Sequence, residues 1–169
     1  SLVYRDMWQS SGRYVPRKDQ LARVAPVIID MGCFDRVETN GGASEQVNLL
    51  YGENPNQAVR TFCKPFNAAV IKTPICCGLD DPRNIIPSIK RANEAGMTAQ
   101  ATMCIPYSKV HNAEYYINLA EQLIAGGAQE ICLKDMAGIG RPHMLGVIVA
   151  AIKEKHPDII IQYHGHTGP

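Results

Sequence analysis

Residues 130–169 carry the repeat that decides the fold. It reads EICLKDMAG (130–138), RPHMLGVIVAAIKEKH (141–156) and PDIIIQYHGHTGP (157–169). The first and third pieces contain short apolar runs of strand length, and the middle piece repeats apolar residues at helical spacing: Leu145, Ile148, Val149 and Ile152. A strand, a helix and a second strand in this order predict parallel strands joined by a right-handed crossover.

Each of these two predicted strands ends in groups that can bind a metal. Lys134 and Asp135 follow the first apolar run, and His164 and His166 follow the second. Alternate residues of a strand point to the same face, so the two histidines should point the same way, about 6 to 7 Å apart along the chain. This arrangement suits two imidazoles on one cation, and the alternative is an incidental pair of surface histidines.

Composition is that of a soluble globular domain. The 169 residues are 46% hydrophobic and 20% charged, with a net charge of +1. Without a basic excess, neither nucleic acid nor an anionic membrane is an expected partner. No apolar run approaches the roughly 20 residues that span a bilayer, so we expect a cytoplasmic protein. The six cysteines form no C-x-x-C pair, which favours reduced, mostly buried thiols over a zinc ribbon.

Strand-like runs recur along the whole chain at intervals of about 30 residues, the length of one βα unit. The remaining strand candidates are 1–4, 33–38, 68–77 and 98–105, and helices are expected from 16, over 45–51 and 55–63, from 82, and over 113–125. Six units are too few for a complete eight-stranded barrel, which takes about 250 residues. We therefore expect an α/β fold, namely an incomplete (β/α)8 TIM barrel over 1–169 that stops after the His-x-His strand.

The end of the first strand candidate contributes a further candidate metal ligand. Asp6 follows the first strand candidate, and in a parallel barrel it would share one mouth with Lys134, His164 and His166. One carboxylate and two imidazoles suit a divalent metal such as Zn, Mn or Co. Periodicity alone favours an ion pair of Lys134 with Asp135 or Asp6. The alternative is a lysine carbamate, formed when a neutral amine adds carbon dioxide, which would supply an anionic oxygen ligand.

Two other functional motifs, a dinucleotide-binding fingerprint and a hydrolase triad, are not supported by the sequence. Gly138 and Gly140 begin a dinucleotide fingerprint, but His143 stands where its third glycine should be. Ser10 and Ser11 have no histidine nearby in the sequence to suggest a hydrolase triad.

With these residues in hand, the chain resembles the carboxyltransferase domains of biotin-dependent enzymes, which include pyruvate carboxylase, oxaloacetate decarboxylase and transcarboxylase. Four motifs carry the resemblance: R-D-x-x-Q-S at 5–10, E-T-N-G-G-A at 38–43, C-L-K-D-M-A-G at 132–138 and H-x-H at 164–166. The wider superfamily of isopropylmalate synthase and hydroxymethylglutaryl-CoA lyase is similar in the Arg-Asp and His-x-His motifs but lacks the lysine. The resemblance therefore favours the carbamate for Lys134.

The resemblance implies a site of definite composition. Asp6, carbamylated Lys134, His164 and His166 would hold a divalent metal that polarises the keto oxygen of pyruvate or oxaloacetate and favours the enolate. Arg5 and Gln9 would bind the keto acid, and Gln9 would also take part in catalysis.

The resemblance also implies partners. Biotin on a carrier protein or domain would deliver or accept the carboxyl group. Biotin carboxylase or membrane decarboxylase subunits would complete the enzyme, and the full-length parent would be a homo-oligomer.

Two features of the chain depart from the family. A strand that carries a substrate-binding arginine, with its helix, is missing near 66–77. Many members carry a threonine two residues after the second histidine, where this chain has Gly168, so Thr167 is the candidate catalytic hydroxyl. Two alternatives to the carboxyltransferase therefore stay open: an acyl-CoA lyase or synthase of the same superfamily, and a non-catalytic assembly fragment.

Overall fold

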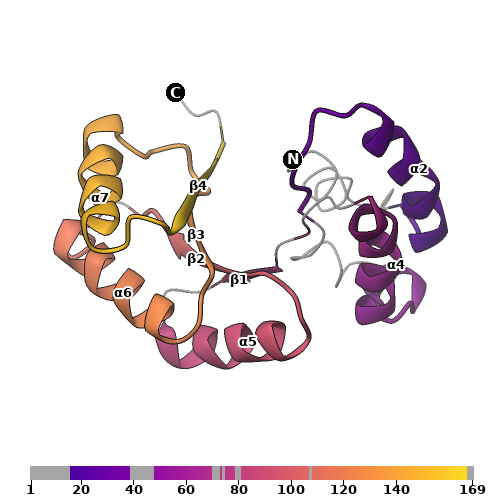
Figure 1. Ribbon diagram of the computed structural model, residues 1–169, viewed down its shortest axis with the longest axis horizontal. Helices are drawn as coiled ribbons and strands as arrows, with labels where there is room; N and C mark the ends of the chain where they lie inside the picture. Colours follow the sequence, from indigo (N-terminus) through magenta and orange to yellow (C-terminus); the bar gives the residue numbers. More distant parts are fainter. Residues whose placement is uncertain are drawn as a thin grey trace. The chain divides into compact units, whose positions relative to one another are not determined.

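The computed structural model describes residues 16–38, 48–69, 73, 75–78, 81–106 and 108–166 (Figure 1). The chain divides into two compact units, 1–75 and 76–169, which are described here separately. No helix in the described part of the chain is long and apolar enough to cross a membrane.

The first unit contains two packed helices, α2 (Lys18–Asp30) and α4 (Pro55–Ala68). A buried apolar cluster joins them, and its residues are Leu21 and Ala25 from α2, Ala58, Phe62 and Phe66 from α4, and Val37 from the segment after α2. The Phe62 and Phe66 rings meet edge to face with centroids 5.2 Å apart. Asn54 caps α4 as its position before a proline predicts, because its side-chain oxygen accepts a hydrogen bond from the Gln57 amide at 3.3 Å.

Helix α2 differs in detail from its prediction. It begins at Lys18 rather than at Pro16, continues through Pro26, and ends before Gly32, whose φ of 63° suits glycine. Leu21 and Ala25 are buried on its inward face, whereas Val24 is 43% exposed.

The predicted strand at 33–38 is wrong. In this segment only Arg36 forms an isolated bridge. Val37 is fully buried in the helix cluster and Phe34 packs against the same cluster. Two inward residues three positions apart do not fit the two-residue alternation of a strand, so the segment runs as an irregular connection.

The second unit is a parallel α/β arrangement. Its four-stranded sheet has the order β1-β2-β3-β4, and the strands are β1 (Ile75–Gly78), β2 (Ala99–Cys104), β3 (Glu130–Asp135) and β4 (Ile160–Gly165). Strands β2 and β4 both pair with β3 in parallel, with Glu130 opposite Gln100 on one side and Ile160 on the other. This confirms the α/β class and the parallel pairing of these three strands.

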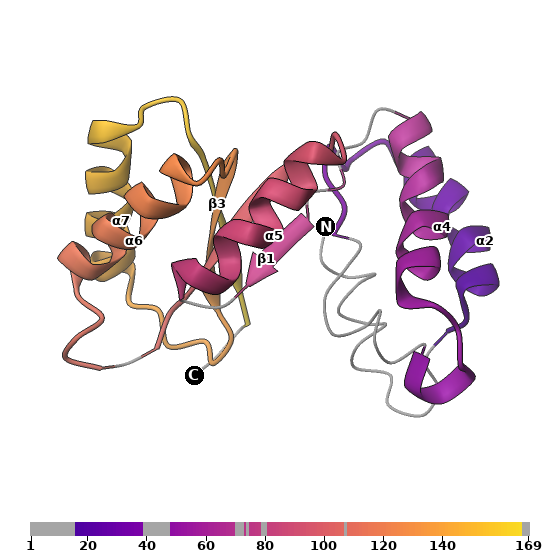
Figure 2. The same ribbon diagram turned by 90° about the horizontal axis from the view of Figure 1, so that it is seen from below.

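Helices join the consecutive strands and lie on one side of the sheet (Figures 1 and 2). They are α5 (Pro82–Glu94), α6 (Ala113–Ala125) and α7 (Pro142–Lys155). A single-sided arrangement follows from right-handed crossovers that always step to the next strand in the same direction. Asp81 and Asn112 cap α5 and α6 through their side-chain oxygens, and Gly96, with φ of 72°, follows the last turn of α5.

The sheet has one apolar face and one polar face. Alternation directs Ala101, Met103, Ile131 and Leu133, all buried, toward the helices. On the other face a Glu130 carboxylate oxygen accepts hydrogen bonds from the side-chain amides of Gln100 at 3.1 Å and Gln162 at 3.3 Å. This row crosses three strands and ties their amino-terminal halves together.

Candidate metal centre

Lys134 and His164 lie directly opposite each other near the carboxyl ends of β3 and β4. Paired residues of adjacent strands point to the same face, so both side chains leave the sheet on its polar side. His164 is 4% exposed and Lys134 is partly buried. The parallel register thus brings together two residues that are 30 positions apart in the sequence.

His166 lies one residue beyond β4, so the strand ends earlier than a His-x-His strand would require. Its main-chain amide donates a hydrogen bond to the Asp135 carbonyl at 3.2 Å, which extends the pairing of the two strands past their ends. The His164 and His166 rings have centroids 6.3 Å apart and planes inclined by 43°. The structure therefore places the two imidazoles side by side, one buried and one exposed.

Asp135 occupies the opposite face and is 1% exposed. Its carboxylate accepts hydrogen bonds from the Ile139 amide at 2.9 Å, the Gly140 amide at 2.6 Å and the Tyr163 hydroxyl at 2.9 Å. Desolvation acts to raise the pKa of this carboxyl, but these hydrogen bonds outweigh it and hold the pKa below the usual value. Desolvation, followed by the hydrogen bond to Asp135, raises the pKa of the Tyr163 phenol.

Periodicity alone favoured an ion pair of Lys134 with Asp135 or Asp6, and the structure contradicts the pair with Asp135. Among the described residues no ion pair joins the two, because neighbouring strand positions point to opposite faces. The Asp135 carboxylate is bound instead by the loop that follows β3 and by Tyr163. Asp6, the other predicted partner of Lys134, lies outside the described residues, as do Arg5, Gln9 and Thr167.

The donors that the structure describes fit part of a transition-metal site. Two neighbouring imidazoles suit zinc, manganese or cobalt better than magnesium or calcium, which prefer oxygen ligands. A lysine becomes an oxygen donor only as a carbamate, and Lys134 lies directly opposite His164 in the strand register. Within the described part of the chain, no three His, Cys, Asp or Glu side chains form a group that could hold a metal ion.

Sequence reasoning missed a second polar pair beyond the carboxyl end of β2. The Ser108 hydroxyl and His111 Nδ1 are 2.8 Å apart, and the Ser108 oxygen accepts a hydrogen bond from the Val110 amide at 3.2 Å. The His111 ring meets Tyr115 edge-on with centroids 4.7 Å apart. Spacing of three residues in a loop carried no signal that could distinguish this contact from an ordinary turn.

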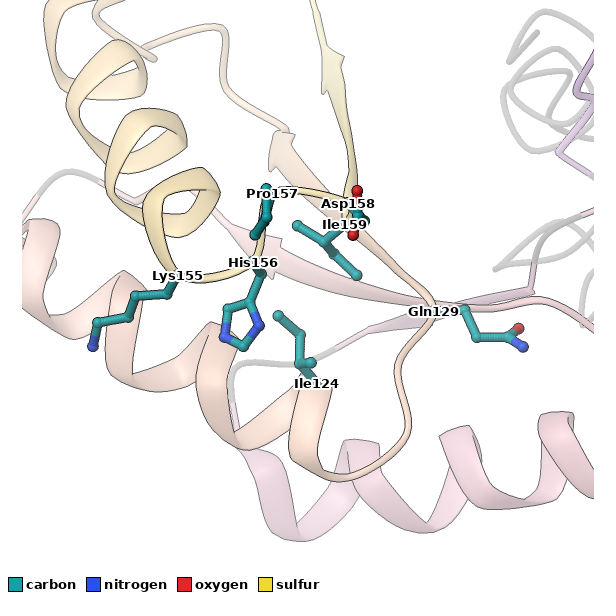
Figure 3. A pocket seen from close by; sticks show the side chains of 7 residues that line it. All are labelled: Ile124, Gln129, Lys155, His156, Pro157, Asp158 and Ile159. Atoms are coloured by element: carbon teal, nitrogen blue, oxygen red, sulfur yellow. The ribbon is translucent and has the colours of Figure 1, made fainter.

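The pocket in Figure 3 lies at the other end of the sheet. Its volume is about 380 Å³, and it is lined by Ile124, Gln129, Lys155, His156, Pro157, Asp158 and Ile159. Gln129 and Ile159 precede β3 and β4, so this pocket is at the amino-terminal edge. His164 is five positions after Ile159, about 16 Å of extended chain, so the pocket is separate from the candidate metal centre.

Comparisons with known proteins identify relatives. The chain is 32% identical over 124 residues to pyruvate carboxylase of Schizosaccharomyces pombe, a match over 70% of this chain and 10% of that protein. It is 39% identical over 93 residues to the methylmalonyl-CoA carboxyltransferase 5S subunit of Propionibacterium freudenreichii subsp. shermanii, over 53% of this chain and 18% of that protein. The chain thus spans less than a fifth of either relative. A scan of family models found no match.

Solved structures with the same fold are also found. The carboxyl transferase domain from Rhizobium etli pyruvate carboxylase, solved with pyruvate and biocytin, superposes with a TM-score of 0.73 at 20% identity, over 97% of this chain and 34% of that one. The HMG-CoA lyase from Brucella melitensis gives a TM-score of 0.59 at 18% identity, over 98% and 70% of the two chains. At these identities the structures establish the α/β fold, whereas the sequence relatives establish kinship. By its sequence the chain is therefore a relative of pyruvate carboxylase and of the methylmalonyl-CoA carboxyltransferase 5S subunit over part of their length.

Proposed function

We propose that this chain is part of a metal-dependent carboxyltransferase that moves a carboxyl group between carboxybiotin and pyruvate. The observation that carries the proposal is the register of β3 and β4, which sets Lys134 opposite His164 in a chain related to pyruvate carboxylase. In the carboxylation direction, the carboxyl group leaves the biotin nitrogen for the methyl carbon of pyruvate, and a methyl proton passes to that nitrogen. Oxaloacetate decarboxylation is the reverse half-reaction.

We propose that residues 76–169 are consecutive βα units of a (β/α)8 barrel. Parallel strands in sequential order, helices on one side and a polar row from Gln100 to Gln162 on the other support this arrangement. Only six residues separate the end of α4 at Ala68 from the start of β1 at Ile75. This connection supports the proposal that one βα unit of the family is missing near 66–77.

Four residues would hold the metal in this proposal: Asp6, Lys134 as its carbamate, His164 and His166. A bound zinc, manganese or cobalt ion would supply Lewis-acid polarisation of the keto oxygen. His164 is suited to a fixed position because β4 holds it at 4% exposure, while the exposed His166 follows the strand at the solvent side.

The remaining site residues would act on the substrate and the proton. Arg5 and Gln9 would bind the keto acid, Gln9 would orient its reacting carbon, and the Thr167 hydroxyl would carry the proton between that carbon and the biotin nitrogen. Biotin would arrive on a carrier protein or domain. Biotin carboxylase or membrane decarboxylase subunits would complete the enzyme, which we propose to be a homo-oligomer.

Oxaloacetate decarboxylation with free biotin tests the reaction. We expect the metal-loaded chain to release pyruvate in a biotin-dependent manner and the Lys134→Ala variant to fall to the rate without protein. Lys155→Ala is the matched control, because Lys155 lies at the far end of the sheet in an ion pair with Glu121. Unchanged turnover in Lys134→Ala would remove Lys134 from the site. Cleavage of an acyl-CoA without any response to biotin would favour the lyase, and no reaction with either substrate would favour an assembly role.

A further inference from the structure

A compact hydrogen-bonded cluster lies on the face of the sheet opposite Lys134 and His164. Its members are Asp135, Tyr163 and the two glycines Gly140 and Gly165. Tyr163 reaches Asp135 across the strand pair, and Asp135 in turn binds the amides of Ile139 and Gly140. We propose that these four residues form a positioning clamp that fixes the ends of β3 and β4, and through them Lys134, His164 and His166.

At both glycines, another member of the clamp lies too close to the backbone for a Cβ to fit without a shift. A Cβ at Gly165 would collide with the ring and hydroxyl of Tyr163, because the tyrosine folds back over position 165 to reach Asp135. A Cβ at Gly140 would lie 2.7 Å from the Asp135 carboxylate oxygen that the Gly140 amide binds. The middle glycine of the His-Gly-His segment therefore makes room for the tyrosine.

Asp135 links both sides of the candidate site. Its side chain holds the loop after β3 and the hydroxyl of Tyr163, which is the residue before His164. Its carbonyl accepts the amide of His166 at 3.2 Å, and its own neighbour in the chain is Lys134. Asp135 thus follows Lys134 in the chain and contacts both the Tyr163 side chain and the His166 main chain, so a shift of Asp135 moves the proposed ligands relative to one another.

The alternative is that Tyr163 and Gly165 are ordinary strand residues with no positioning role. It makes a different prediction for Gly165→Ala, because alanine is the better strand residue and its Cβ would stabilise β4. A clamp predicts the reverse, since the added Cβ displaces the Tyr163 ring from Asp135.

Binding of Co²⁺ alone to the full 169-residue chain provides the test, and this inference rests on the proposed metal site. We expect Gly165→Ala and Tyr163→Phe to weaken Co²⁺ binding by roughly 10-fold and to change the visible absorption of the bound ion, as loss of groups that orient metal ligands does. Asn112→Ala is the matched control, because it removes the cap of α6 without touching the strand ends, and its Co²⁺ affinity and spectrum should stay unchanged.

A double-mutant comparison isolates the contact between the two residues. In a Tyr163→Ala background the ring is gone, so adding Gly165→Ala should change the Co²⁺ affinity by less than about 2-fold. Unchanged affinity and spectrum in Gly165→Ala and Tyr163→Phe, with a wild-type chain that binds Co²⁺, would overturn the clamp and leave the proposed function standing. A wild-type chain that binds no Co²⁺ would contradict the proposed function and the positioning role together.

Discussion

At the scale of single residues, Lys134 and Asp135 show how adjacent side chains acquire different roles. Lys134 leaves the sheet on the polar face, opposite His164, whereas Asp135 leaves it on the other face and binds two loop amides and the Tyr163 hydroxyl. The alternation of the strand separates a proposed ligand from the residue that positions it. A substitution at either residue should therefore disturb the site for a different reason.

The carbamate makes a prediction that concerns Lys134 alone. Removing dissolved carbon dioxide should weaken divalent-metal binding by the wild-type chain, because a protonated lysine amine has no lone pair to offer a metal and only the carbamate supplies an oxygen donor. Lys134→Glu brings a carboxylate of its own, so its metal binding should be insensitive to carbon dioxide.

Isothermal titration with Zn²⁺, in degassed buffer and in buffer with bicarbonate, measures both effects. Lys153→Glu, on α7, is the charge-matched control and should respond to bicarbonate as the wild type does. Equal Zn²⁺ affinities of the wild type in the two buffers would argue against a carbamate.

The sequence predicted those residues of the candidate site that belong to local motifs. His164 and His166 were visible as an alternating pair, and Lys134 through the Lys-Asp-Met-Ala-Gly segment. The bond between Tyr163 and Asp135 was not, because it joins residues 28 positions apart and depends on the register of two strands. The role of Gly165 follows only from the position of the tyrosine ring.

At the scale of elements, β3 lies between its two partner strands, and its Ile131 and Leu133 are buried on the apolar face of the sheet. Ile131 is fully buried there. We expect Ile131→Ala to lower the free energy of unfolding by about 2 to 5 kcal/mol, because the removed atoms leave a cavity in a packed interior. Urea unfolding followed by circular dichroism measures the change.

Val110→Ala is the control for this substitution. Val110 is 67% exposed, so its truncation should change the free energy of unfolding by no more than about 0.5 kcal/mol. Similar losses in the two variants would show that β3 is not a core strand.

The N-cap of α5 should make the stability of the chain depend on pH in the acid range. The side-chain hydrogen bond from Arg83, followed by the Arg83 backbone amide, holds the pKa of Asp81 below its usual value. A lowered folded-state pKa means that the contribution of Asp81 to stability is present above the unfolded pKa of about 3.9 and is lost as the pH falls through the folded value.

Asp81→Asn keeps a good capping side chain that does not titrate in this range. We expect the urea midpoint of the wild type to fall relative to that of the variant as the pH is lowered from 5 to 3. Parallel pH profiles for the two proteins would contradict this assignment.

Most helices and strands of the second unit followed from local patterns, and the irregular part of the first unit did not. The strand predicted at 68–77 is too long, because Ala68 ends α4 and β1 begins at Ile75. Helix α6 has the predicted bounds, because its apolar repeat is regular and Asn112 and Gly126 mark its ends. The segment 33–38 contains enough apolar residues for a strand, yet Phe34 and Val37 turn to the same helix cluster. Tertiary packing overrode a short pattern there, and no local signal distinguishes the two outcomes.

At the scale of the whole molecule, the second unit has the organisation of a parallel α/β layer with its candidate site at one edge. The helices bury one face, and the other face carries the polar row of Gln100, Glu130 and Gln162 and, farther along the strands, Lys134 and His164. The carboxyl ends of parallel strands are where such folds bind ligands. The proposed metal site therefore lies at the edge of the sheet where parallel α/β folds bind their ligands.

The central claim is that Lys134, His164 and His166 belong to one metal site, and elemental analysis of the purified chain tests it most directly. After loading with Zn²⁺ and removal of free ions, the wild type should retain about one ion per chain, as a single closed site does. His164→Ala should retain less than about a tenth of that amount, whereas His143→Ala, at the exposed start of α7, should match the wild type. A wild-type chain without stoichiometric metal, or a His164→Ala variant that keeps its ion, would contradict the account.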